Sequence, residues 1–345
     1  MRYRTPAQSR RRFVLGTAGL ATAASFAPLR VLGQDATPGA TPEAVAVEAP
    51  DMTGAAHAFS VGSFTCWSVS DGANTGPFTG ALAFGGMEEA EAEAIIQEAG
   101  VDPSQFVAHH TSTVIDTGSE IILVDTGAGR SGLPEAGILI DNLRRIGIQP
   151  NAIDVVVLTH GHPDHVGGNL TATGNPLYTN ARYVMAQEEW DFWTDAERVR
   201  AEAPADLVDT FLENVEANLV PLDGTIELIG YDEEIVPGVT SVDARGHTPG
   251  HMALRVESDG DTLWVMGDAA LNAVQISFPE AIGLPDTYPD EVVATRERLF
   301  AEIADSGAQA VFNHFDPFPS LGEIVSEGDT WAWQPVEVAT GEEDA

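Results

Sequence analysis

The sequence predicts two β-sheets that pack against each other and carry helices on their outer faces. Strand-like apolar runs alternate with helical patterns between residues 56 and 338. The strands fall into two groups, before and after residue 185, and each group has helices beside it. Amphipathic sheets and helices bury their apolar faces by stacking in layers, so this pattern favours a single layered domain.

The expected elements are placed by apolar periodicity and by turn residues. Strands are expected at 57–70, 110–117, 120–125, 155–159, 239–243, 252–257, 262–266, 310–312 and 330–338. Helices are expected at 87–99, 132–146, 188–218 with a break at Pro204, and 288–306. Gly118-Ser119 predicts a hairpin turn between the second and third strands.

The most informative motif is His160-Gly-His162-Pro-Asp164-His165, directly after the apolar run 153–158. That run predicts a buried strand, so rigid backbone aims the side chains that follow it. In an extended segment His160 and His162 point to the same side, whereas Asp164 and His165 follow the turn at Pro163. A single ion with an open position usually takes three protein ligands, so four candidate ligand residues here suggest two ions.

Further ligand-type residues end other predicted strands. Asp125, Asp268 and His314 each come within two residues of the end of an apolar run, and His247 and His251 come after the strand 239–243. A metal site assembled from the strand ends of packed sheets would show this pattern.

These motifs, in this order, resemble the metallo-β-lactamase superfamily of hydrolases, from about residue 58 to residue 338. The resemblance implies an α/β (α+β) protein with an αββα four-layer sandwich. It implies seven ligands for two ions: His160, His162 and His247 for metal one, Asp164, His165 and His314 for metal two, and Asp268 as the bridge. It also implies that Asp125 and His251 hold ligands in place from behind.

The resemblance implies catalysis by two divalent ions. Zinc suits these ligands best, and iron, manganese and cobalt are alternatives. Two such ions lower the pKa of a bridging water to about 7, and the resulting hydroxide attacks a carbonyl carbon or a phosphorus. Asp164 and Asp268 are the candidate catalytic residues, and Asp268 can both fix the metal spacing and accept a proton.

Within the superfamily, the chain resembles the methyl-parathion-hydrolase and N-acyl-homoserine-lactonase branch. The resemblance lies in segments 187–193, 273–279, 314–322 and 331–336, whereas the long insert 72–105 departs from it. We therefore expect hydrolysis of a lactone, an ester or an organophosphate triester. The alternatives are a catalytically silent member that binds metal for structure or partner docking, and a glyoxalase II-like thioesterase.

The charge of the chain limits its partners. All 16 basic residues are Arg, and the part after residue 33 has 10 of them against 53 acids, a net charge of −43. Such a surface repels phosphate backbones and anionic lipid, so nucleic acid is excluded as a partner. A small neutral substrate is expected, and a homodimer is left open.

The N-terminus predicts export. Ser9-Arg-Arg-Arg-Phe-Val-Leu15 resembles a twin-arginine signal, followed by a weakly apolar stretch too short to span a bilayer. The expected division is 1–33 signal peptide, 34–56 disordered linker, 57–338 hydrolase domain and 339–345 acidic tail. The mature protein is expected in the periplasm or outside the cell, with no membrane attachment after signal cleavage.

Several residues are expected to be structural. His57, His109 and His110 belong to no motif and are interpreted as structural or surface groups. The only cysteine, Cys66, lies in an alternating run and is predicted to be a core residue. The aromatic residues of 190–193 are predicted to pack in the core of a helical layer.

Overall fold

The structure is a computed structural model that describes residues 54–76, 84, 89–99, 101, 106–133 and 135–338. The predicted signal peptide, most of the predicted linker and the acidic tail lie outside these residues. Among the residues described, no helix combines the length and apolar character needed to cross a membrane.

The first sheet contains seven strands in chain order. They are β1 (Ala56–Val61), β2 (Phe64–Gly76), β3 (Phe106–Asp116), β4 (Ile121–Val124), β5 (Val155–Leu158), β6 (Arg182–Ala186) and β7 (Ile226–Ile229). The strands from β1 to β4 pair antiparallel, and those from β4 to β7 pair parallel. The parallel half therefore brings several strand ends to one edge of the sheet.

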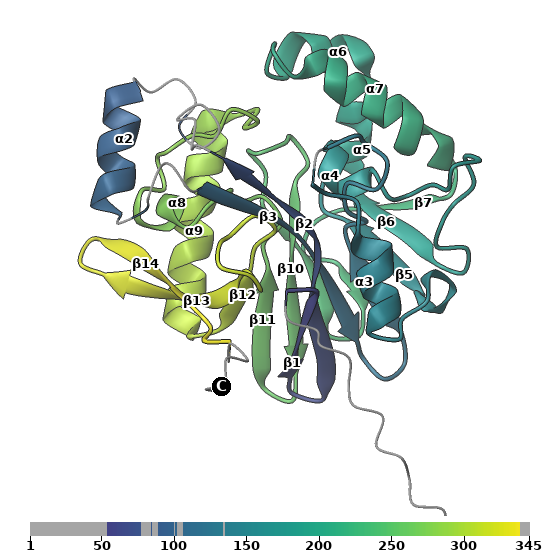
Figure 1. Ribbon diagram of the computed structural model, residues 1–345, viewed down its shortest axis with the longest axis horizontal. Helices are drawn as coiled ribbons and strands as arrows, with labels where there is room; N and C mark the ends of the chain where they lie inside the picture. The colour runs from purple at the N-terminus through teal and green to yellow at the C-terminus, as the bar shows by residue number, and fades with distance from the viewer. Residues whose placement is uncertain are drawn as a thin grey trace, which may run out of the picture. The chain divides into compact units, whose positions relative to one another are not determined.

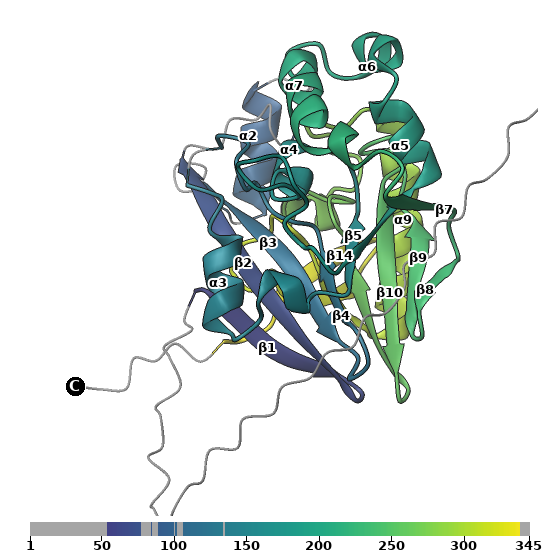
Figure 2. The same cartoon turned by 90° about the vertical axis from the view of Figure 1, so that its right-hand side faces the viewer.

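The second sheet also contains seven strands, in reverse order across the sheet. They are β8 (Glu234–Val236), β9 (Val239–Asp243), β10 (Met252–Ser258), β11 (Asp261–Val265), β12 (Gln309–Val311), β13 (Leu321–Glu327) and β14 (Thr330–Pro335). Only the β11–β12 pair is parallel among the pairs of this described sheet. Figures 1 and 2 show the two sheets facing each other.

Helices lie around the two sheets (Figure 1). They are α2 (Glu89–Glu98), α3 (Leu139–Arg145), α4 (Pro163–Val166), α5 (Gln187–Trp193), α6 (Ala196–Glu202), α7 (Val208–Asn218), α8 (Val274–Ser277) and α9 (Pro289–Ser306). Short 3-10 turns occupy Pro150–Ala152 and Val220–Leu222. Helices α3 to α7 accompany the first sheet, and α9 covers the second.

The core consists of three main apolar layers, which confirms the αββα sandwich. In β5, Val155 and Val157 face the second sheet, whereas Val156 and Leu158 pack beneath the helices of the first. Successive side chains of a strand point to opposite faces, and a strand covered on both faces is apolar throughout. Cys66 is fully buried between the sheets, as predicted.

The structure corrects several predicted boundaries. The expected strand 57–70 is a hairpin, because Gly62 adopts φ +54° and turns the chain between β1 and β2. The expected helix 132–146 is shorter, since Gly132 and Gly137 have positive φ angles that a right-handed helix does not allow. The first sheet also extends to Ile229, so the sheets divide there and not near residue 185.

Candidate metal centre

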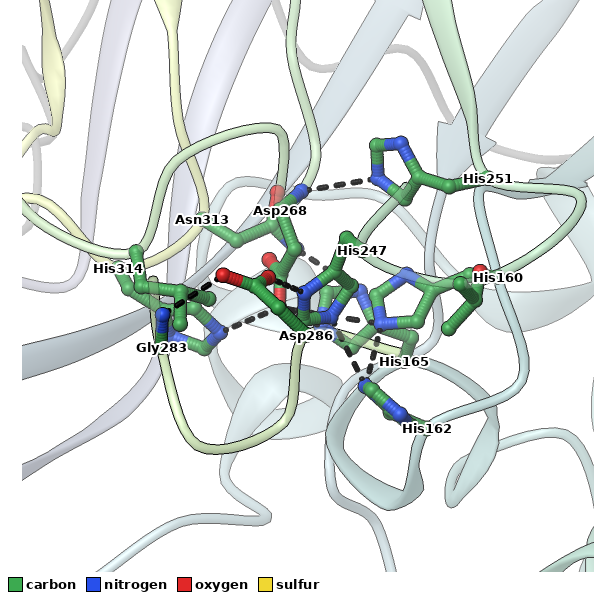
Figure 3. A network of polar contacts seen from close by, with 12 residues as sticks. His160, His162, His165, His247, His251, Asp268, Gly283, Asp286, Asn313 and His314 are labelled. Atoms are coloured by element: carbon green, nitrogen blue, oxygen red, sulfur yellow. Dashed lines mark hydrogen bonds and ion pairs between the residues drawn. The ribbon is translucent and has the colours of Figure 1, made fainter. Parts of the chain in front are cut away.

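The seven predicted ligands meet just beyond the C-terminal ends of four strands. His160 and His162 follow β5, and Asp164 and His165 lie in α4 directly after them. The other three follow strands of the second sheet: His247 after β9, Asp268 after β11 and His314 after β12. Figure 3 shows the rings of His160, His162, His165 and His247 gathered beside Asp268.

The first group consists of His160, His162 and His247. Nδ1 of His162 lies 3.0 Å from Nε2 of His160 and 3.0 Å from Nε2 of His247. All three side chains are buried. Three ring nitrogens facing one another at this distance gain little as hydrogen-bond partners, but they match the ligand set of one ion.

The second group consists of Asp164, His165 and His314. Oδ2 of Asp164 lies 3.6 Å from Nε2 of His165 and 3.3 Å from Nε2 of His314. Asp268 stands between the groups. Its Oδ2 is 3.4 Å from His165 Nε2 and 3.2 Å from His314 Nε2, and also 3.3 Å from His247 Nε2.

In four histidines, the ring nitrogen that points away from the other ligands lies close to an oxygen that can accept a hydrogen bond from it. The pairs are His160 Nδ1 with Thr159 Oγ1 (3.0 Å), His165 Nδ1 with Asp125 Oδ2 (2.8 Å), His247 Nδ1 with Asp286 Oδ1 (2.8 Å) and His314 Nδ1 with the carbonyl of His109 (2.7 Å). Such contacts place the ring proton on the outward nitrogen and leave the inward lone pair for a metal.

His162 is held differently, by aromatic packing. Its ring stacks on Phe211 with centroids 4.3 Å apart and meets the edge of Trp193 at 5.5 Å. Its Nε2 is buried and has no hydrogen-bond partner in the described part of the chain. Phe192 and Trp193 are buried in the helical layer, as predicted, and Trp193 also fixes this ligand.

Asp125 and His251 lie behind the ligands, as the resemblance implies. Asp125 accepts hydrogen bonds from the backbone N–H and the hydroxyl of Thr159, both at 2.8 Å, and from His165. His251 donates through Nδ1 to the carbonyl of Ala244, and its Nε2 accepts from the backbone N–H of Asp268 at 3.0 Å. Asp125 therefore joins two ligand segments, and His251 fixes the start of the Asp268 loop.

The electrostatics suit bound cations. Burial, reinforced by neighbouring imidazoles, holds the pKa of His160 and His162 well below the usual value. Burial alone would raise the pKa of Asp268, but the imidazoles of His314 and His165 outweigh it and hold that pKa well below normal. His160 and His162 are thus held as neutral imidazoles and Asp268 as an ionised carboxylate, the forms that bind metal. Burial alone would lower the pKa of His165, His247 and His314, but the neighbouring carboxylate of Asp268 outweighs it and raises each pKa, so a bound cation would displace protons from these rings.

Two buried ligand atoms strengthen this interpretation. His165 Nε2 and Asp268 Oδ1 are buried without a hydrogen-bond partner among the described residues. Buried polar atoms are normally paired, so unpaired atoms that converge on one point indicate a ligand. The imidazole and carboxylate donors fit two divalent ions, with Asp268 shared between them.

The sequence prediction for His110 is wrong. His110 lies on β3, with Nδ1 at 3.2 Å from Asp164 Oδ2 and Nε2 at 2.6 Å from Asn74 Oδ1. Asp164 is 54 positions away in sequence, so the tertiary fold and not the local sequence brings the two side chains together. Asp286 and Asn313 were also missed, because neither belongs to a motif with a recognisable spacing.

A cavity of about 390 Å³ opens onto the second group and Asp268. Its apolar lining is Phe106, Ala108, Leu133, Pro163, Leu207, Phe211, Leu271, Leu284 and Pro285. The ionisable side chains among its described lining residues all lie at the metal-facing end: His110, His162, Asp164, Asp268 and His314. Its volume suits a small molecule. Asn74, which lies in the insert 72–105, also lines it.

The family model described as "Metallo-beta-lactamase superfamily" matches residues 107–313. The match spans more than half of the chain, so the chain belongs to this superfamily, a class of metal-dependent hydrolases.

Relatives within the superfamily include lactonases. An N-acyl homoserine lactonase from a Bacillus species is 26% identical over 166 residues, which cover 42% of this chain and 57% of the relative. A probable metallo-hydrolase of Bacillus subtilis, YflN, is 26% identical over 170 residues, or 47% of this chain and 60% of the relative. The match thus spans less than two thirds of the length of these curated relatives.

Two solved structures share the fold over most of the chain. The dizinc quorum-quenching lactonase AidC superposes with a TM-score of 0.73 at 21% identity, covering 83% of this chain and 99% of AidC. The hydrolase AbOPH of the beta lactamase superfamily gives a TM-score of 0.73 at 25% identity, with the same coverage.

Proposed function

We propose that this protein is a dinuclear metal-dependent hydrolase that opens small neutral lactones. The single observation that carries the proposal is the convergence of two ligand groups on Asp268 at the floor of an apolar cavity. Similarity to N-acyl homoserine lactonases supports the choice of lactones.

The roles of the residues follow from their positions. Two divalent ions supply an activated water at neutral pH and polarise the substrate oxygen. His160, His162 and His247 hold the first ion, and Asp164, His165 and His314 hold the second. Asp268 lies between the groups, so its carboxylate sets their separation. Asp268 and Asp164 both line the cavity and are placed to accept a proton there.

The cavity lining favours a neutral, partly apolar substrate. A charged group among side chains such as Phe106, Leu207 and Phe211 would lose hydration without a partner. Esters and organophosphate triesters share this neutral, electrophilic character, so they are the second candidates.

Metal identity, export and assembly complete the proposal. Imidazole and carboxylate ligands favour zinc, with iron, manganese and cobalt as alternatives. Residues 1–33 act as a twin-arginine signal, and the mature enzyme works in the periplasm or outside the cell. A homodimer remains an alternative to a monomer, and sedimentation of the mature protein decides between them.

The experiment that tests the function uses the mature protein, reconstituted with zinc, manganese or cobalt. Bound metal is measured, and hydrolysis is followed with an acyl lactone, an aryl ester, a thioester and a chromogenic phosphotriester. Turnover of the lactone with two ions bound per chain is expected. Two bound ions without turnover of any substrate would support the silent alternative, and preference for the thioester would support a glyoxalase II-like activity.

A further inference from the structure

Glu189 is a fully buried carboxylate in α5, outside the two ligand groups. Both of its oxygens are used twice. Oε1 accepts from the backbone N–H of Gly161 at 2.8 Å and from the Trp193 indole at 2.5 Å. Oε2 accepts from the Thr248 hydroxyl at 2.8 Å and from the backbone N–H of Gly250 at 2.9 Å.

Three of these donors, all except Trp193, belong to the two loops that carry the first group. Gly161 separates His160 from His162 in the loop after β5. Thr248 follows His247 directly, and Gly250 is two residues further along the loop after β9. One side chain therefore ties a loop of the first sheet to a loop of the second sheet, immediately behind three candidate ligands.

The two loops approach α5 so closely that only glycine fits at both contact points. A Cβ at Gly161 would lie 2.4 Å from the Trp193 ring, and a Cβ at Gly250 would lie 2.1 Å from the backbone nitrogen of Glu189. The backbone amides are thereby brought within reach of the carboxylate. Trp193, the third donor, also touches the ring of His162.

We propose that Glu189 is the positioning residue for the first metal ion, because it fixes the spacing of His160, His162 and His247 across the two sheets. The inference rests on the proposed metal site. Metal affinity depends on such outer hydrogen bonds, and their loss typically weakens binding about 10- to 100-fold.

The chemistry of the donors explains why a carboxylate is needed. The two backbone N–H groups and the indole can only donate, so all three require an acceptor. A glutamine would turn its amide N–H₂ toward two of the four donors, and at least one backbone N–H would be left unpaired even if the Thr248 hydroxyl accepted from the amide. Burial raises the pKa of Glu189, but the four hydrogen bonds oppose that rise by favouring the ionised form.

The test compares Glu189→Gln with Asp71→Asn in the full-length metal-binding protein. Asp71 is a matched control, since it is also buried and accepts two backbone N–H groups, from Ala128 and Leu139. Each variant is made alone and in a His314→Ala background, which weakens the second ion so that the remaining zinc reports on the first group. Zinc affinity is measured by competition with a chelator.

Glu189→Gln is expected to weaken the first-group ion about 10- to 100-fold, while Asp71→Asn changes it less than about threefold. In the metal-free protein, amide exchange at Gly161 and Gly250 should accelerate in Glu189→Gln and not in Asp71→Asn. Thr248→Val removes one donor without altering the carboxylate, and it should weaken the same ion to a smaller extent. If Glu189→Gln does not fold, the zinc affinity of Thr248→Val tests the proposed role of Glu189 instead.

Unchanged first-group affinity in Glu189→Gln, or in Thr248→Val where only that variant folds, would overturn the inference. Equal loss of both ions would overturn it too. A wild-type protein that binds zinc without hydrolysing any substrate would refute the proposed function and leave this inference standing. A wild-type protein that takes up no zinc would refute both.

Discussion

Nδ1 of His247 lies 2.8 Å from Oδ1 of Asp286, and both side chains are fully buried. Oδ2 of Asp286 accepts from the backbone N–H of Gly283 at 2.7 Å and from Nη2 of Arg296 at 3.2 Å. Arg296 is also buried, and its Nε donates to the carbonyl of Ala269. A candidate metal ligand is thus connected through one carboxylate to a buried guanidinium on α9.

Asp286→Asn is expected to weaken both the metal site and the fold. His247 loses a charged acceptor that orients its ring, so the first-group ion should bind about 10- to 100-fold less tightly. Arg296 loses its counter-charge, so the free energy of unfolding of the metal-free protein should fall by roughly 3–5 kcal/mol. Chelator competition and urea unfolding measure the two effects. Asp305→Asn, at an exposed position of α9, the helix that carries Arg296, should change neither.

His162→Ala tests the assignment of the two groups. The substitution removes a first-group ligand but no ligand of the second group, so the first ion should be lost at zinc concentrations that still fill the second. Hydrolysis should fall to background, because activation of the water needs both ions. Zinc content after dialysis against graded chelator and single-turnover assays provide the measurements.

The control for this substitution is His57→Ala. His57 lies on β1 and contacts Phe59, away from the ligand groups. The His57→Ala protein should retain both ions and full activity. Simultaneous loss of both ions in His162→Ala has two explanations: the ligands form one undivided site, which contradicts the division into two groups, or they form two sites coupled through the shared Asp268. Glu189→Gln distinguishes them, because retention of one ion in that variant would show that there are two sites.

The ligand residues were predictable because each follows a short apolar run. A buried strand such as β5 is recognisable from four consecutive apolar residues, and His160 comes two positions after its last one. The end of a strand fixes where the next side chains lie. Apolar runs therefore marked the layered fold and the places of the candidate ligands, whereas the division of the seven candidates between two ions came from the family resemblance.

The residues behind the ligands were not predictable in the same way. His110 meets Asp164 only because the fold brings β3, which is separated from β5 by one strand, close to the loop that carries the motif. Asp286 occupies an irregular segment before α9, where no periodicity marks a residue as buried. Short strands such as β7 and β8 were missed for a related reason, since three or four residues give too little alternation to read.

His110→Ala should loosen the second ion selectively. His110 contacts Asp164 through Nδ1 and packs edge-on against His314 with centroids 5.2 Å apart. Without it, both second-group ligands gain freedom, and affinity for that ion should fall about 10-fold. His109→Ala is the matched control on the same strand, since its ring pairs with the exposed Asp316. A larger loss in the control than in His110→Ala would count against this role.

Cys66 provides a test of the packing between the sheets. Burial, helped by the charge of Asp116, raises the pKa of this thiol from 9.0 to about 12. The native protein therefore keeps the thiol neutral at a pH where the unfolded chain ionises it. The resulting stability is fully present below pH 9 and is lost as the pH rises toward 12. Between pH 9 and 10.5 the loss should reach roughly 2 kcal/mol.

The measurement is urea unfolding of the metal-free wild type and of Cys66→Ala between pH 8 and 10.5. Other groups titrate in this range in both proteins, so only the difference between the two unfolding free energies reports on Cys66. That difference should move by roughly 2 kcal/mol against the wild type as the pH rises. A thiol reagent at pH 8 should label Cys66 only in urea, because the side chain is fully buried between the sheets in the native protein. Parallel stability curves, or rapid labelling of the folded protein, would show that the space between the sheets admits solvent.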